Sequence, residues 1–211
     1  MPETVKMIVV LTLISAVASL GLAAFNEQTK PAIAENERQF TLRSIKKVLP
    51  ETDAPNPCEK SEPKFDNSPD QDSVCMDGMV VYRGRKGDDI VGLAVVAVGD
   101  KAYSGTITTL VGIGLDGQVT GIEVLKHAET PGLGAKIEAC DWRSQLVGKG
   151  ASDMVWKVTK DGGAVDQISG ATISSRSMID AILKTQKLLA EKKDAILSAE
   201  PMGEGEVCNA G

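Results

Sequence analysis

The first hydrophobic pattern in this chain of 211 residues is an uninterrupted apolar run near its start. Residues 7–26 carry no charged side chain and are mostly Val, Leu, Ile and Ala. At about 1.5 Å of rise per residue, a helix of this length crosses the hydrocarbon core of a bilayer. No polar stripe marks the run as a helix of a soluble core. We therefore expect residues 1–26 to form an N-terminal transmembrane anchor.

A cleaved signal peptide is the alternative interpretation of this run. Ala16-Val17-Ala18 is an acceptable small-x-small cleavage site. Against cleavage, the apolar run continues past Ala18, and Lys6 is the only basic residue in front of it. Basic and acidic residues are mixed after the run, so the distribution of positive charge does not decide its orientation in a membrane.

Two segments of different character follow the apolar run. In residues 27–50, Ile33, Phe40, Ile45 and Val48 recur at roughly helical spacing and Pro50 ends the pattern, which predicts a helical connection. Residues 51–78 have no hydrophobic period and are rich in Pro, Asp, Asn and Ser, which predicts a long loop or surface insert.

Runs of β-branched residues typical of β-strands begin after this insert. The β-branched runs are Val80–Tyr82, Ile90–Val98, Ile107–Ile113 and Val119–Val124. Asp116-Gly117 is the clearest hairpin turn between them. These features predict an antiparallel, twisted sheet.

Helical patterns dominate the last part of the chain. Residues 137–146 are expected to form a short helix, and Met154–Val158 a further strand. Residues 174–198 have their apolar side chains on one face, which predicts a long amphipathic helix. The predicted fold class is therefore α+β: a small antiparallel β-sheet packed by helices, with one N-terminal transmembrane helix.

Composition and charge narrow the function classes. The formal net charge is −6, and residues 51–78 account for all of it with eight acidic and two basic side chains. This balance argues against a nucleic-acid partner, which needs a basic face. A single histidine excludes a multi-histidine metal site, and we expect no metal in this chain. Without a nucleophile–base pair or a dinucleotide glycine motif, any chemistry must depend on backbone groups, hydroxyls, carboxylates or a cofactor.

The first candidate for chemistry is the segment 166–175. Small residues at 169–171 let the backbone approach a ligand, and Ser174 or Ser175 is expected to cap the following helix. Thr172 would then lie where free backbone N–H groups attract an anion. The alternative is a tight strand-to-helix turn without any ligand.

The second candidate is the loop 127–134. Thr130-Pro131-Gly132 forces a turn, and the two glycines of the loop expose backbone donors and acceptors that suit a planar ligand. The alternatives are an ordinary surface loop and, for His127, a packed or solvated side chain rather than a catalyst.

Four cysteines suggest an oxidising compartment, because their number is even. Cys58 and Cys75 flank the acidic insert, and a disulfide between them would close it into a covalent loop. Cys140 and Cys208 have no sequence feature that pairs them. The chain has no C-x-x-C spacing, which argues against a zinc or iron–sulfur site within it.

Together these segments resemble a known family. The chain is similar to the RnfG family, the G subunits of the Rnf electron-transport complex, and, more distantly, to the C subunits of the sodium-pumping quinone reductase. The most specific match is Asp166-x-x-Ser169-Gly170-Ala171-Thr172, the flavinylation motif of that family. Further matches are the anchor followed by Asn26–Pro31, Tyr103–Gly105 leading into Leu110–Ile113, the loop Glu129–Gly134, and Lys160–Gly163. The acidic, cysteine-bearing insert departs from the family pattern.

The resemblance implies a cofactor and its site. Thr172 would be joined to FMN through a phosphoester bond by a separate flavin transferase that uses FAD and Mg²⁺, and residues 79–211 would be the FMN-binding domain. The resemblance implies that Glu129, Thr130 and Leu133 contact the isoalloxazine ring and that Gly170 and Ala171 meet the flavin through backbone atoms. It also implies that Lys160 lies near the ring, where positive charge would favour the reduced, anionic flavin. Ser169 and Gly134 would complete the site. Trp142 and Trp156 are expected to pack in the core rather than to stack on the ring.

The same resemblance implies a cellular role. The chain would be a single-pass protein of the inner (cytoplasmic) membrane with its soluble domain on the extracytoplasmic side. There it would carry electrons with the other Rnf subunits in an ion-translocating ferredoxin:NAD oxidoreductase, without being catalytic alone. Two alternatives are a membrane-anchored flavoprotein reductase that acts on a soluble acceptor, and an anchored binding module without enzymatic activity.

Overall fold

A computed structural model describes residues 2–49, 65–68, 71–203 and 208 of the chain. The chain forms two compact units, Met1–Phe40 and Thr41–Gly211. The first unit is helical and belongs to α1, which runs without a break over Glu3–Val48 and includes Pro31. Among the described helices, α1 is the one that is long and apolar enough to cross a membrane, judged by length and composition.

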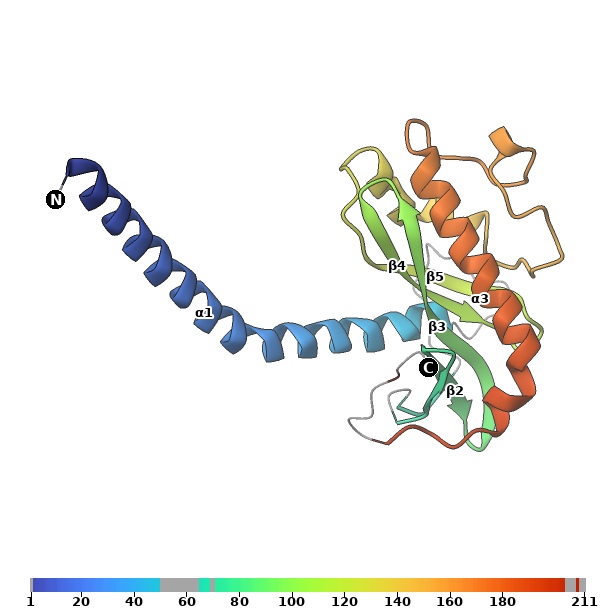
Figure 1. Cartoon of the computed structure of the whole chain (residues 1–211). Coiled ribbons are helices and arrows are strands. Elements are labelled where there is room, and N and C mark those ends of the chain that lie inside the picture. The colour runs from blue at the N-terminus through green and yellow to red at the C-terminus, as the bar shows by residue number, and fades with distance from the viewer. Residues whose placement is uncertain (1, 50–64, 69–70, 204–207, 209–211) are drawn as a thin grey trace. The chain divides into compact units, whose positions relative to one another are not determined.

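The second unit is built on a five-stranded sheet (Figure 1). Every strand pairs antiparallel with the next one along the chain, so the strand order is β1-β2-β3-β4-β5. Gly117, with φ of 86°, forms the predicted Asp116-Gly117 turn between β4 and β5. The sheet confirms the predicted fold class. The strands are β1 (Ser73–Met76), β2 (Met79–Lys86), β3 (Asp89–Ala102), β4 (Gly105–Ile113) and β5 (Val119–Lys126).

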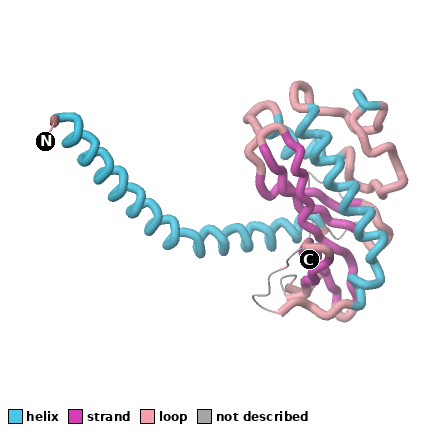
Figure 2. The backbone as a smooth tube through the Cα atoms, viewed as in Figure 1, coloured by secondary structure: helices cyan, strands magenta, loops and turns pink. Residues whose placement is uncertain are grey.

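Both faces of the sheet are covered, which explains why the central strands have few exposed positions. The long helix α3 (Thr172–Ser198) packs along one face, chiefly against β3 (Figures 1 and 2). On the other face lie the last turn of α1 with Ile45 and Val48, followed by Leu49, all at most 2% exposed. The Thr120 hydroxyl donates a hydrogen bond of 2.6 Å to the carbonyl oxygen of Val48.

Three elements differ from the sequence predictions. The predicted helix 137–146 is divided into a 3₁₀ turn, η1 (Gly134–Glu138), and a short helix, α2 (Cys140–Ser144). The predicted strand Met154–Val158 is wrong: only an isolated bridge joins Val158 to Val165. The segment instead bonds to residues 163–165, which follow the turn η2 (Thr159–Asp161). Strand β1 lies inside the segment 51–78, which was predicted as a loop throughout.

The disulfide prediction was also wrong. Cys75 pairs with Cys208, across 133 residues of sequence, and so cannot pair with Cys58, which lies outside the described residues. Cys140 is disulfide-bonded as well. The Cys75–Cys208 bond and the hydrogen bond from Met202 N to Ser73 O connect the C-terminal segment to β1, one of the two edge strands of the sheet.

Glu123 on β5 joins three elements of the second unit and makes its stability depend on pH. One carboxylate oxygen lies 2.6 Å from Lys47 Nζ near the end of α1, and the other lies 2.7 Å from Arg143 Nη1 on α2. Burial alone would raise the pKa of Glu123, but hydrogen bonds and charge attraction from Lys47 and Arg143 outweigh it and lower the pKa. A depressed carboxyl pKa contributes stability above the ordinary pKa, and this contribution is lost as the pH falls.

We expect Glu123→Gln to lower the free energy of unfolding by about 1 kcal/mol at pH 7, as for a partly buried ion pair. The deficit relative to the unmodified chain should shrink as the pH falls below about 4.5, where Glu123 itself becomes protonated in the unfolded chain. Urea unfolding followed by tryptophan fluorescence from pH 7 to pH 3.5 measures this. A deficit that stays constant over that range contradicts the assignment.

Candidate functional site

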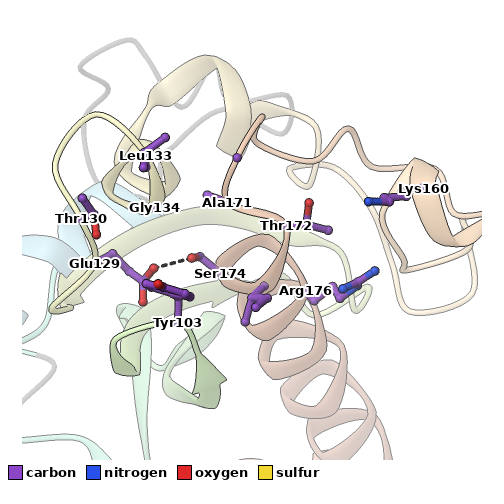
Figure 3. Close-up of a pocket in the computed structure, with 12 residues that line it drawn as sticks. Tyr103, Glu129, Thr130, Leu133, Gly134, Lys160, Ala171, Thr172, Ser174 and Arg176 are labelled. Carbon is purple, nitrogen blue, oxygen red and sulfur yellow. Dashed lines mark hydrogen bonds between the residues drawn. The ribbon is translucent and has the colours of Figure 1, made fainter.

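A cavity of about 610 Å³ opens where four segments of the second unit meet (Figure 3). These segments are the turn between β3 and β4, the loop after β5, the turn η2, and the start of α3 with the residues before it. The volume is in the range of small-molecule and cofactor sites. The lining residues are Tyr103, Glu129, Thr130, Leu133, Gly134, Lys160, Gly170, Ala171, Thr172, Ile173, Ser174 and Arg176.

The structure therefore brings together the two sequence segments that were singled out for chemistry. Of the residues predicted for the site, only Ser169 does not line the cavity; its side chain is exposed next to it. Trp142 and Trp156 are also outside the lining. Both are buried, and their indole N–H groups donate to the carbonyl oxygens of Asp166 and Gly150, which fits the expected core packing.

Glu129 forms the buried, acidic side of the cavity. It is 5% exposed, and its carboxylate accepts a hydrogen bond of 2.8 Å from the backbone N–H of Ser104 and another from the Ser174 hydroxyl (Figure 3). A buried charge without partners is costly, and these two donors satisfy it. Glu129 thus connects the β3–β4 turn and α3 to its own loop.

His127 fixes the start of this loop from outside the cavity. Its Nδ1 accepts a hydrogen bond of 3.0 Å from the backbone N–H of Glu129, so the proton of the neutral ring is on Nε2, which faces Glu138 at 2.8 Å. The side chain is a structural member of the loop, in line with the alternative considered from the sequence.

Thr172 is the first residue of α3 and is half-buried in the cavity wall. Gly170, with φ of 77°, adopts the left-handed conformation of the turn before it. The prediction that Ser174 or Ser175 caps the helix was wrong, because the helix begins earlier, with Ala171 at the N-cap position. Ser174 donates to Glu129, and Ser175 donates to the carbonyl oxygen of Ala171 from inside the first turn.

The opposite side of the cavity is basic. Lys160 extends from η2 toward Thr172, and Arg176 lies one turn further along α3 (Figure 3). Asp161 binds Arg176 through two hydrogen bonds, to Nε at 2.6 Å and to Nη2 at 2.7 Å. The bond to Arg176 is the main reason that the pKa of Asp161 is lowered, and in turn it raises the pKa of Arg176.

Four lining residues were not predicted from the sequence: Tyr103, Ile173, Ser174 and Arg176. Helical spacing could have found Arg176, because it follows Thr172 by four positions and so lies on the same face of α3. Ile173 and Ser174 directly follow Thr172, inside the candidate segment 166–175, but neither of them was predicted to have a place in the site. Tyr103 depends on which turn of the sheet meets α3, and local sequence does not specify that.

Gly134 controls how closely the loop approaches α3. A Cβ at this position would lie 2.2 Å from Glu129 Oε2 and 3.0 Å from Ser174 Oγ. We expect Gly134→Ala to push the carboxylate away from Ser174 and to lower the free energy of unfolding by about 1–3 kcal/mol in a urea titration. Gly150→Ala is the control, because there the nearest atom is the end of the Asp153 side chain at 3.2 Å. Equal effects of both substitutions would contradict this interpretation.

Comparison with known proteins defines the class of this domain. Residues 102–187 match the family described as FMN-binding domain. This range contains β4, β5, the loop 127–134 and the first part of α3, so it includes every residue that lines the cavity. The cavity is therefore part of an FMN-binding domain.

Curated relatives define the family more narrowly. The chain is 35% identical over 178 residues to the G subunit of the ion-translocating oxidoreductase complex of Shewanella baltica, covering 82% of each chain. It is 36% identical over 197 residues to the G subunit of the complex of that name from Escherichia coli, covering 88% of this chain and 91% of the relative. The crystal structure of Shewanella oneidensis NqrC is similar at 20% identity and a TM-score of 0.47, over 61% of this chain and 70% of that one.

The chain belongs to the family of G subunits of the ion-translocating oxidoreductase complex. This confirms the resemblance found in the sequence motifs. The family consists of redox subunits of an enzyme complex.

Proposed function

We propose that this chain carries FMN, attached by a phosphoester bond to Thr172, and passes electrons within a membrane-bound ion-translocating ferredoxin:NAD oxidoreductase. The observation that carries the proposal is the position of Thr172. It is the residue of the Ser-Gly-Ala-Thr motif whose hydroxyl lies at a cavity of cofactor size, inside an FMN-binding domain. The bound flavin would supply the electron-transfer chemistry, and the protein would position it.

Attachment would need a second enzyme. The Thr172 hydroxyl makes no hydrogen bond to any described residue, so no carboxylate or imidazole of the described chain activates it as a nucleophile. A flavin transferase would bring FAD and Mg²⁺. The Thr172 oxygen would bond to the FMN phosphorus of FAD, the phosphoanhydride bond would break, AMP would leave, and the hydroxyl proton would be released.

The lining residues have roles that their chemistry supports. Glu129, Thr130 and Leu133 would contact the isoalloxazine ring, and Gly134 would keep the loop close to α3. Gly170 and Ala171 would meet the flavin through backbone atoms, where no bulky side chain intervenes. Ser169 would belong to the motif that the transferase recognises, since it is exposed beside the cavity. Lys160 would supply positive charge at the basic side.

The proposal includes a location. Residues 1–26 would anchor the chain in the cytoplasmic membrane, and residues 79–211 would form the FMN domain on the extracytoplasmic side. The Cys75–Cys208 disulfide supports that side, because disulfides persist in oxidising compartments. Covalent attachment suits such a location, since a dissociated FMN could not be replaced there.

The decisive experiment is denaturing gel electrophoresis of the full chain produced together with a flavin transferase. We expect a band of flavin fluorescence at the mass of this chain, and an intact mass increased by one FMN residue. The positive control is a known flavinylated protein that is labelled in the same strain. A colourless chain without the mass increase in that strain would contradict the proposal.

A further inference from the structure

One side of the cavity is acidic and the other is basic, and Thr172 lies between the two sides (Figure 3). Glu129 supplies a buried carboxylate on one side. Lys160 and Arg176 supply two cations on the other. An anionic group attached at Thr172 would be repelled by Glu129 and attracted to the basic side.

Asp161 presents Arg176 in one orientation. The carboxylate takes Nε and Nη2 of the guanidinium in a bidentate pair, the geometry in which an arginine fork is most rigid. Within the described residues, no acceptor binds Nη1, which keeps both of its hydrogens for another group. Arg176 also lines the cavity, one turn along the same helix face as Thr172.

The surroundings of the pair carry an excess of positive charge. Lys157 and Lys160 act on Asp161 in the same direction as Arg176, while Asp180 is the further carboxylate that acts on Arg176. Three cations therefore lie around two carboxylates on this side of the cavity, which favours an anion there over the side that holds Glu129.

We propose that Arg176, positioned by Asp161, is the phosphate-binding side chain of this site, with Nη1 donating to the phosphate of the flavin. This inference rests on the proposed function and adds to it the direction of the cofactor: phosphate toward η2 and α3, ring toward Glu129. Arg176 is the binding residue. Asp161 is a positioning residue that acts through it.

The test measures the preference for phosphate without the covalent bond. The full chain with Thr172→Ala, purified in detergent, is titrated with free FMN and with riboflavin while flavin fluorescence is followed. The two ligands have the same ring and differ in the phosphate. Truncation at Thr172 also makes room for the additional phosphate oxygen of free FMN. We expect FMN to bind about tenfold more tightly than riboflavin, as one charge-assisted hydrogen bond implies.

Second substitutions in that chain assign the preference to residues. Arg176→Gln should bring the ratio of the two dissociation constants to about 1, and Asp161→Asn should lower it partly. Lys192→Gln is the matched control, because Lys192 is another cation of α3 that pairs with an aspartate, Asp77, but lies outside the cavity lining. It should leave the ratio unchanged.

A double variant that exchanges the two residues, Asp161→Arg with Arg176→Asp, distinguishes phosphate binding by Arg176 from a purely structural ion pair. It restores an ion pair between η2 and α3 but removes the cation from position 176, so the preference should stay lost. Recovery of the preference in the exchanged chain, an unchanged ratio in Arg176→Gln, or no FMN binding up to millimolar concentration overturns the inference. Each of these results is distinguishable from failure of the proposed function, in which the unmodified chain does not acquire flavin.

Discussion

A chain carrying Thr172→Ala, produced together with a flavin transferase, should show no flavin fluorescence on a denaturing gel and no mass increase. The loss should be complete, because the substitution removes the only atom through which the phosphoester would form. The fold should remain, since Thr172 is half-buried at the first position of a helix of 27 residues and its hydroxyl holds no other described group. Tryptophan fluorescence, which reports on the buried Trp142 and Trp156, checks that the domain is folded.

Two further variants make this result specific. Thr130→Ala removes another threonine hydroxyl from the same cavity and should leave the covalent flavin in place. Thr172→Ser keeps a hydroxyl at the same position and should restore attachment at least in part. Fluorescence that persists in Thr172→Ala would mean that another residue carries the flavin.

The parts of the fold that were predicted correctly are those with a strong local pattern. The β-branched runs became β2 to β5, and the period of 3.6 in residues 174–198 became most of α3. The glycines and small residues of the two candidate loops also predicted most of the cavity correctly, because residues without a bulky side chain let the backbone approach a ligand closely.

The predictions that failed depend on contacts between distant segments. Met154–Val158 has the composition of a strand, but its backbone bonds to residues 163–165, beyond the turn η2, and not to the sheet. Strand β1 forms because β2 provides a partner for it, although its surroundings in the sequence are those of a loop. The pairing of Cys75 with Cys208 joins residues separated by almost the whole domain, and no local spacing could indicate it.

Arg83 is the clearest case of a residue whose role only the structure reveals. It lies on β2 and is only 1% exposed, although arginine side chains are mostly exposed in proteins. Its guanidinium pairs with Asp72 and donates to the carbonyl oxygens of Ile196 at 3.0 Å and Ala199 at 2.7 Å. The last turn of α3 is thereby fastened to the sheet through one buried side chain.

We expect Arg83→Met to be the most destabilising of the substitutions considered, with a loss of about 3–5 kcal/mol in the free energy of unfolding. Methionine fills much of the same volume, but it leaves the buried Asp72 with fewer partners and the carbonyl oxygens of Ile196 and Ala199 without this donor. Urea unfolding of the full chain in detergent, followed by tryptophan fluorescence, measures the loss.

Arg85→Gln provides the matched control for this effect. Arg85 is on the same strand and contacts the same Asp72 carboxylate, but its side chain is 30% exposed. Water can therefore replace its contribution, and we expect a loss of about 1 kcal/mol or less. The contrast between the two arginines tests burial rather than charge, since both substitutions remove one positive charge beside one carboxylate. Equal losses would mean that the attraction to Asp72, and not the buried hydrogen bonds to the end of α3, determines how strongly that helix is held on the sheet.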